Sequence, residues 1–298
     1  MSDKRRSHPP TLLRLAEREI RESGLIPKGD RVLAAVSGGP DSMALLHVLS
    51  ILRTRLGFEL SAHAVIHGLR PEADEEVALA ERKAKELGVP FDVSRLRVAA
   101  GGNLQARARE ARLRALRKAA KNQEASCIAL GHHADDRAET VLLRILRGCG
   151  PAGLAAMPSR ADDLIRPFIR ARRSDVIHHL HRHGVSFATD PSNRDRRFQR
   201  ARVRDEVLPL LESMSPKVVD HLCRLAQDVE ALRLPTSGMG RAQLEQLARA
   251  AAAGDANVRV SLPAGRVARL DISTGRIVVE APKGTKGARK PRHAPDDA

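Results

Sequence analysis

The chain has 298 residues, of which 42% are hydrophobic, and its formal net charge is +16. No apolar run reaches the roughly 18 residues that a membrane span needs, and the polar N-terminus lacks the apolar stretch of a secretory signal, so we expect a soluble, cytoplasmic protein. The three cysteines, Cys127, Cys149 and Cys223, lie far apart and form no C-x-x-C pair, which argues against a disulfide framework, a zinc knuckle or an iron–sulfur cluster.

The basic excess favours a polyanionic partner, because Lys and Arg release counterions from phosphate groups. The chain has five Phe, no Tyr and no Trp, which argues against a surface that stacks single-stranded bases on aromatic rings. If RNA binds, arginine side chains and phosphate contacts must carry most of the binding. Part of the charge lies in residues 283–292, which we expect to be disordered.

The first two-thirds of the chain alternates short β-rich runs with amphipathic helical runs, a pattern typical of a parallel sheet covered by helices. We predict an α/β fold of this kind. The predicted strands are 31–36, 60–66, 91–98 and 127–130. The predicted helices are 11–23, 42–56, 71–88, 103–122 and 135–147, with Asn103 as an N-cap.

The pattern changes beyond residue 150. A Gly- and Pro-bearing loop at 148–158 is followed by predicted helices, and a linker at 235–240 precedes a small unit of one helix and three strands. The helices are predicted at 174–183, 199–211, 216–234 and 243–253, and the strands at 258–262, 266–271 and 276–280. We therefore predict a main domain over 1–212, a small helical and β domain over 213–282, and a basic tail over 283–298.

Six residues join the first strand to its helix: Ser37, Gly38, Gly39, Pro40, Asp41 and Ser42. The glycines let backbone N–H groups approach an anion, and the helix adds its unpaired N–H groups and the positive end of its dipole. Asp41 would repel phosphate unless a cation lay between them, which indicates bridging Mg²⁺. The segment lacks the Gly-Lys-Ser/Thr ending of the common mononucleotide loop. It predicts a nucleotide site, the alternative being an ordinary Gly-rich turn.

Two further segments follow predicted strands, and loops at the carboxyl ends of parallel strands meet at one edge of the sheet. The segment with His132, Asp136 and Glu139 follows the fourth strand, and His67 ends the second. Asp135 and Glu139 share a helix face if the helix begins near Asp135. We expect Asp136 to supply a second Mg²⁺ contact and His67 to lie near a ligand. The alternative is a solvated, acid-rich helix start.

Two groups of arginines complete the set of candidates. Arg109 and Arg112 project together at i,i+3, either as a solvated basic face or as a grip on phosphate. Arg200 and Arg204 belong to a basic run after the turn that ends at Asn193. That run is either plain solvated surface or the RNA contact, and the net charge favours the contact.

These segments occur in the order found in the tRNA(Ile)-lysidine synthases, a family within the PP-loop ATP pyrophosphatases, and the resemblance covers residues 12–212. The loop resembles the Ser-Gly-Gly-x-Asp-Ser signature of the PP-loop group. The other matches are 67–70 with Asp74, Ala-Arg-Glu-Ala-Arg at 108–112, Gly-His-His-Ala-Asp-Asp at 131–136, Arg-Gly-x-Gly-x-x-Gly-Leu at 147–154, 165–167, Asp-x-Ser-Asn at 190–193 and 207–211.

The resemblance implies an ATP-dependent ligation of free lysine to C2 of cytidine 34 in the CAU anticodon of tRNA(Ile). ATP would adenylate the C2 carbonyl oxygen with release of pyrophosphate, and the lysine amine would then displace AMP. The residues 37–42 and His67 would bind the nucleotide, and Asp41 and Asp136 would hold Mg²⁺. Catalysis would also use Arg109, Arg112 and His132, and the tRNA contacts would be Asn193, Arg200 and Arg204.

The resemblance also leaves alternatives open. Ala201 stands where the family has Asn, and Leu113 where it often has an aromatic residue. Another PP-loop tRNA-modifying enzyme, such as a tRNA 2-thiocytidine synthetase, would need cysteine pairs. A non-catalytic basic RNA-binding protein would have no need of Asp41 and the Asp135–Asp136 pair. By the same resemblance residues 1–212 are catalytic and 213–282 contact tRNA, and a homodimer stays open.

Overall fold

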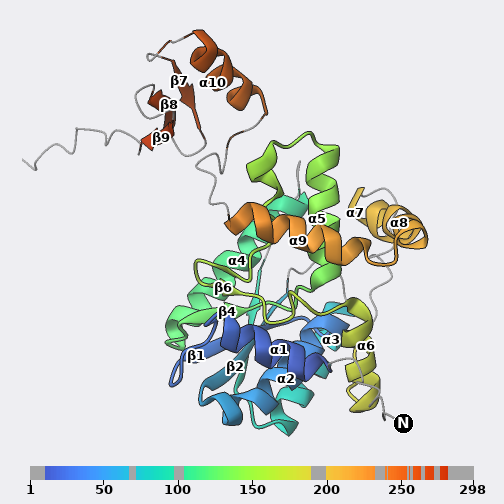
Figure 1. Ribbon diagram of the computed structural model, residues 1–298. Coiled ribbons are helices and arrows are strands. Elements are labelled where there is room, and N and C mark those ends of the chain that lie inside the picture. The colour runs from blue at the N-terminus through green and yellow to red at the C-terminus, as the bar shows by residue number, and fades with distance from the viewer. Residues whose placement is uncertain are drawn as a thin grey trace, which may run out of the picture. The chain divides into compact units, whose positions relative to one another are not determined.

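The computed structural model describes residues 11–66, 72–96, 104–188, 199–231, 239, 241–253, 255, 258–262, 266–271 and 276–280 (Figure 1). His67, Asn103, Asn193 and the tail 283–298 lie outside the described residues, as does most of the predicted linker. The chain divides into two compact units, Met1–Leu143 with Ala156–Gln227 and Arg144–Ala155 with Asp228–Ala298. The domain boundaries at 212 and 282 that we predicted from the sequence stay a prediction.

The first unit is built on a six-stranded sheet in the order β3-β2-β1-β4-β6-β5. The strands are β1 (Arg31–Val36), β2 (Glu59–Ile66), β3 (Phe91–Arg95), β4 (Cys127–Ala129), β5 (Arg160–Ala161) and β6 (Leu164–Ile165). All neighbours pair in parallel except β5, which is antiparallel to β6. Ala34 at the centre pairs with Ala62 on one side and Ala129 on the other. The predicted α/β fold and its four strands are confirmed.

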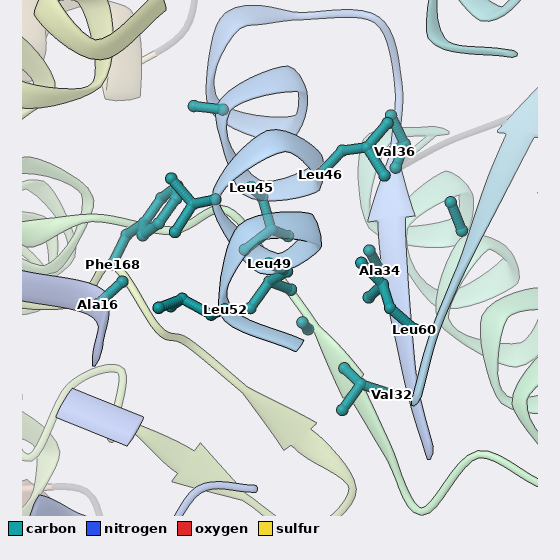
Figure 2. Close-up of a cluster of buried hydrophobic side chains, with 14 of the residues drawn as sticks. Ala16, Val32, Ala34, Val36, Leu45, Leu46, Leu49, Leu52, Leu60 and Phe168 are labelled. Carbon is teal, nitrogen blue, oxygen red and sulfur yellow. The ribbon is translucent and has the colours of Figure 1, made fainter. Parts of the chain in front are cut away.

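Helices cover both faces of this sheet, so β1 is apolar and buried from Val32 to Val36. The helices that begin in this unit are α1 (Leu12–Glu22), α2 (Pro40–Leu56), α3 (Glu72–Glu86), α4 (Leu104–Asn122), α5 (Ala134–Leu146), α6 (Arg173–Arg182), α7 (Gln199–Arg202), α8 (Leu208–Met214) and α9 (Val218–Ala231). Alternate residues of β1 enter separate cores, Ala34 with α1, α2 and α6, and Leu33 with α4. In Figure 2 the leucines of α2 lie between β1 and Phe168.

The helix predicted at 199–211 is three pieces instead of one. A π-helical segment, Val203–Val207, separates α7 from α8, and the N–H of Leu208 bonds to the carbonyl of Val203 five residues back. Pro209 has no N–H to give to the carbonyl four residues before it, so the regular ladder cannot run through this point. Leu208 and Val219 pack against Ala134 and Ala138 of α5, which attaches these helices to the end of β4.

The second unit is a small helix-on-sheet fold. It contains the 3-10 turn Pro151–Leu154 and α10 (Arg241–Ala253), with the antiparallel strands β7 (Arg259–Ser261), β8 (Val267–Asp271) and β9 (Arg276–Glu280). Leu247, Val260 and Ala268 are buried in its core, so the predicted helix and three strands are confirmed. In the part of the chain that the structure describes, every helix is too short or too polar to cross a membrane.

Candidate active site

The loop between β1 and α2 is held in shape by its own residues. Gly38 has φ = 80°, and a Cβ at this position would overlap the backbone carbonyl of Glu76, so only glycine fits. The Ser42 hydroxyl donates to the Gly39 carbonyl at 2.9 Å and accepts from the Ser37 N–H at 3.1 Å. Ser42 therefore closes the turn, and Ser37 is exposed beside the N-terminus of α2, where the first N–H groups of a helix lack partners within the helix and can bind an anion.

A glycine after β4 allows the next strand end to approach this loop closely. A Cβ on Gly131 would lie 2.7 Å from the backbone oxygen of Asp41 and 2.9 Å from its carbonyl carbon. Since real side chains do not approach backbone so closely, Gly131 sets the contact between the two segments. It brings His132 and His133 to the side of Asp41, as the parallel topology predicts.

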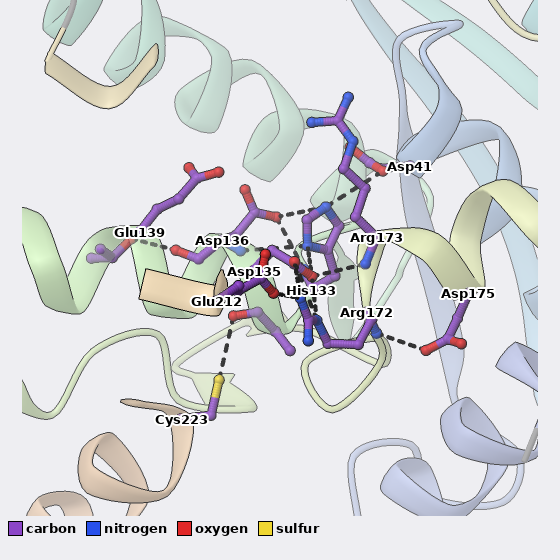
Figure 3. A network of polar contacts seen from close by, with 12 residues as sticks. Asp41, His133, Asp135, Asp136, Glu139, Arg172, Arg173, Asp175, Glu212 and Cys223 are labelled. Atoms are coloured by element: carbon purple, nitrogen blue, oxygen red, sulfur yellow. Dashed lines mark hydrogen bonds and ion pairs between the residues drawn. The ribbon is translucent and has the colours of Figure 1, made fainter. Parts of the chain in front are cut away.

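His133 is the centre of the site, a residue that the sequence reasoning did not single out. Its side chain is 3% exposed, and Nε2 lies 3.6 Å from Asp41 Oδ1 and 3.6 Å from Asp136 Oδ2. Nδ1 lies 3.5 Å from Asp135 Oδ2. Three carboxylates thus surround one buried imidazole (Figure 3). The available signal was the His-His pair directly after a buried strand, from which we selected only His132.

Burial and charge separate the acidities of these groups. Burial, reinforced by the charge of Asp136, raises the pKa of Asp41 against the opposing effect of His133. Burial alone would raise the pKa of Asp136 too, but the nearby His133, His132 and Arg200 lower it. Burial lowers the pKa of His132 to about 4, and nearby arginines act in the same direction. At neutral pH His132 is therefore uncharged and Asp136 is ionised.

Asp135 is occupied by a structural ion pair. Arg172 Nη2 lies 2.9 Å from Asp135 Oδ1 and 2.5 Å from Glu212 Oε1, and the N–H of Arg173 donates to Asp135 Oδ2 at 2.8 Å. These bonds raise the pKa of Arg172, although burial alone would lower it. They connect α5 to α6 and α8, so Asp135 acts as a brace.

Arg200, predicted to contact RNA, lies within the same network. Its Nη2 is 2.9 Å from Asp136 Oδ1 and its Nε is 2.8 Å from Glu139 Oε2. Glu139 therefore shares a partner with Asp136 and not with Asp135, with which the sequence had grouped it. Arg204, the second predicted contact, pairs with Asp205 at 3.0 Å.

Arg109 and Arg112 provide positive charge on α4. Burial lowers the pKa of Arg112, and the like charge of Arg109 adds to the effect. Arg109 is also among the charges that act on His132. Among the ion pairs of the described residues, neither arginine has a carboxylate partner. A partly buried cation beside an exposed one is an arrangement that favours a bound anion.

The carboxylates fit a divalent cation that is shared with a nucleotide. Asp41 Oδ1 is buried without a hydrogen-bond partner, and Asp41 and Asp136 both face Nε2 of His133. Among the described residues, no three His, Cys, Asp or Glu side chains are arranged so that they could hold a metal ion by themselves. Mg²⁺ usually binds one or two carboxylates together with water and substrate phosphates, and two carboxylates are what the site supplies.

The model of the PP-loop domain family matches residues 13–211. The chain belongs to this family. Such domains use ATP. The curated relatives show to which group within this family the chain belongs. A tRNA(Ile)-lysidine synthase from Thermobifida fusca is 39% identical over 232 residues, which cover 75% of this chain and 70% of the relative. The chain is therefore a member of the tRNA(Ile)-lysidine synthase family.

Other comparisons agree on the fold and show a difference in length. A tRNA(Ile)-lysidine synthase from Porphyromonas gingivalis is 38% identical over 221 residues, 72% of this chain but 48% of the relative. The chain thus spans about half the length of that relative, and 52% of a second one from Thermotoga. A solved U34-tRNA thiolase from Methanococcus maripaludis with its [4Fe-4S] cluster has a TM-score of 0.63 at 16% identity, covering 76% of this chain and 86% of that one. That likeness shows a shared fold.

Proposed function

We propose that the protein ligates lysine to C2 of cytidine 34 in the CAU anticodon of tRNA(Ile), consuming ATP and releasing AMP and pyrophosphate. The observation that carries the proposal is the meeting of Asp41 from the loop and Asp136 from the end of β4 at the imidazole of His133. Two carboxylates thus lie beside the N-terminus of α2, an arrangement that would suit a metal-bound triphosphate. The choice of tRNA(Ile) as the substrate is supported by the names of the curated relatives, tRNA(Ile)-lysidine synthase.

The nucleotide is assigned to the loop. Backbone N–H groups between Ser37 and Ser42 would hold phosphate oxygens, and His67, which lies outside the described residues, is proposed to bind the nucleotide as well. Asp41 and Asp136 would hold Mg²⁺, which when bound neutralises charge on the pyrophosphate. Arg109 and Arg112 would grip a phosphate of ATP or of the adenylated base, because both lack a carboxylate partner among the described ion pairs.

The lysine amine must lose a proton before it attacks C2. Asp41 or Asp136 would accept or orient this proton, and the raised pKa of Asp41 makes it the stronger base of the two. His132 is uncharged at neutral pH, so it can orient the amine by hydrogen bonding without repelling it.

The tRNA contact is assigned to the residues around α7 and the π-helical segment that follows it. Arg200 and Arg204 would contact phosphates, together with Asn193, which lies outside the described residues. Both arginines are engaged with carboxylates in the present structure, so RNA must compete for them. The free substrate is L-lysine, a cytoplasmic location follows from the tRNA, and a homodimer stays open.

A sulfur-inserting enzyme is the second candidate, favoured by the fold of the thiolase. The cysteines speak against it. Cys127 is buried in β4, and the Cys223 thiol donates to the Ala134 carbonyl while burial raises its pKa to about 11. Neither thiol has the accessible, low-pKa character of a sulfur carrier.

The deciding experiment incubates the full chain with ATP, Mg²⁺, labelled lysine and tRNA with a CAU anticodon. We expect label in the tRNA and AMP formation that requires both lysine and tRNA, with the elongator methionine tRNA as the control substrate. AMP formation that needs a sulfur donor in place of lysine would support the thiolase class. Binding of tRNA without any AMP formation would contradict both enzymes.

A further inference from the structure

Glu139 is a buried carboxylate with one strong cationic partner. Its side chain is 2% exposed, and it lies one helical turn after Asp136 on α5. Burial raises its pKa, and Arg200 opposes this effect. A carboxylate removed from water needs a nearby positive charge to stay ionised, and Arg200 Nε at 2.8 Å supplies it.

The same guanidinium engages Asp136 with its other end. Arg200 Nη2 lies 2.9 Å from Asp136 Oδ1, and the remaining oxygen, Oδ2, accepts the N–H of His133 at 3.0 Å. Both carboxylate oxygens of Asp136 are therefore in use. A divalent cation approaching Oδ1 would meet a fixed positive charge, because the planar guanidinium is held at two points.

The element that carries Arg200 is short and irregular. It is the four-residue helix α7, followed directly by the π-helical segment Val203–Val207, and π-helical turns frequently occur at functional sites. Glu139, by contrast, lies in the middle of α5, which is packed against α8 and α9 through Ala138 and its neighbours. We therefore infer that Glu139 is the fixed partner of the pair and that Arg200 is the partner that a substrate could displace.

We propose that Glu139 is a positioning residue that holds Arg200 on Asp136, so that the guanidinium occupies the metal-facing carboxylate until substrate withdraws it. The proposal rests on the assignment of Asp136 to the metal under Proposed function. It gives Arg200 a role inside the site, in competition with the divalent cation, in addition to its contact with RNA. Metal binding to the free protein should then be weak, and it should strengthen when this pair is removed.

The test measures Mn²⁺ binding to the full chain by electron paramagnetic resonance, without ATP, lysine or tRNA. The double variant Arg200→Gln/Glu139→Gln leaves net charge unchanged and replaces the pair with neutral amides. We expect it to bind Mn²⁺ about fivefold more tightly than wild type, or better. The matched control is Arg202→Gln/Glu206→Gln, which removes an exposed pair of 3.3 Å in the same segment and should leave Mn²⁺ affinity unchanged.

Two more variants identify the site of the gain. Adding Asp136→Asn to the double variant should abolish the gain, whereas Glu139→Gln alone should give a smaller gain in the same direction. Weaker Mn²⁺ binding in Glu139→Gln would make Glu139 a ligand and overturn the proposal. So would an unchanged affinity in the double variant, an equal gain in the control, or a gain that survives Asp136→Asn.

Thermal unfolding of each variant shows that the comparison is made between folded proteins. The lysine ligation assay is independent of this measurement. If ligation fails while the Mn²⁺ results hold, only the proposed function is lost. If ligation succeeds while the double variant gains nothing, only the role of Glu139 and Arg200 is lost.

Discussion

Asp135 and Asp136 are neighbours on α5, and each belongs to a different arginine–carboxylate cluster. Arg172 joins Asp135 to Glu212, and Arg200 joins Asp136 to Glu139. Asp135 receives two guanidinium nitrogens and a backbone N–H, so its hydrogen-bonding capacity is spent on holding helices together. Asp136 has one bond to each oxygen and faces Asp41 across His133. Adjacent residues of one type thus differ in their partners: Asp135 braces the helices, and Asp136 is the one that we propose to be reactive.

The largest expected effect on the rate of ligation comes from a change at Asp136, the aspartate proposed to hold Mg²⁺. Asp136→Asn should reduce lysine ligation by about a thousandfold, because a neutral amide no longer stabilises the metal on the pyrophosphate. Single-turnover assays at saturating ATP and tRNA measure the change. Circular dichroism should show an unchanged fold. Turnover within a fewfold of wild type would remove the distinction between the two aspartates.

The brace predicts the opposite result. Asp135→Asn should lower the free energy of unfolding by about 2 kcal/mol, because the half-buried Arg172 loses one of its two carboxylate partners. Urea denaturation measures the loss. The folded fraction should keep its ligation rate within about threefold. A large loss of rate without loss of stability would place Asp135 in the chemistry.

A substitution at Gly131 should affect ATP binding by displacing the loop that carries Asp41, without removing any charged group. Gly131→Ala puts a Cβ 2.7 Å from the Asp41 carbonyl oxygen, so the loop must shift. We expect the KM for ATP to rise about tenfold as the loop geometry changes. Gly24→Asn is the control, since a Cβ there meets nothing within 4 Å and Asn tolerates the left-handed backbone of Gly24, whose φ is 56°. An equal KM in both variants would show that the close contact at Gly131 does not set the loop.

The smallest effect is a dependence on pH that belongs to the Asp136 side, where His132 lies. The pKa of His132 is about 4 in the folded protein against an ordinary 6.5, so between these values the unfolded chain holds a proton that the folded chain does not. The free energy of unfolding therefore falls as pH drops from 6.5 to 4, by up to about 1 kcal/mol per pH unit. His132→Gln should reduce this slope. An unchanged slope would mean that His132 does not lie in a desolvated environment.

Sequence reasoning located the parts that depend on local pattern. The loop at 37–42 and the strands around it were predicted because a buried strand, paired glycines and an amphipathic helix are readable in consecutive residues. The hairpin of β5 and β6 was missed, since two-residue strands carry no periodicity. The π-helical segment was missed because one continuous helix has the same apolar spacing, although Pro209 was a local sign of the break.

The sequence by itself determined the fold class, the turn at 37–42 and the approach of Asp41 and Asp136 to one edge of the sheet, because strand patterns and turn chemistry act over a few residues. Only the tertiary structure decided that His133 is the centre, that Asp135 is a brace, and that Arg200 pairs with Asp136 and Glu139. The ion pairs of Asp135 with Arg172 and of Arg200 with Glu139 and Asp136 join residues 37 to 64 positions apart. A side chain chooses among several charged partners by the packing that brings them near, and packing at that range is not written in any local pattern.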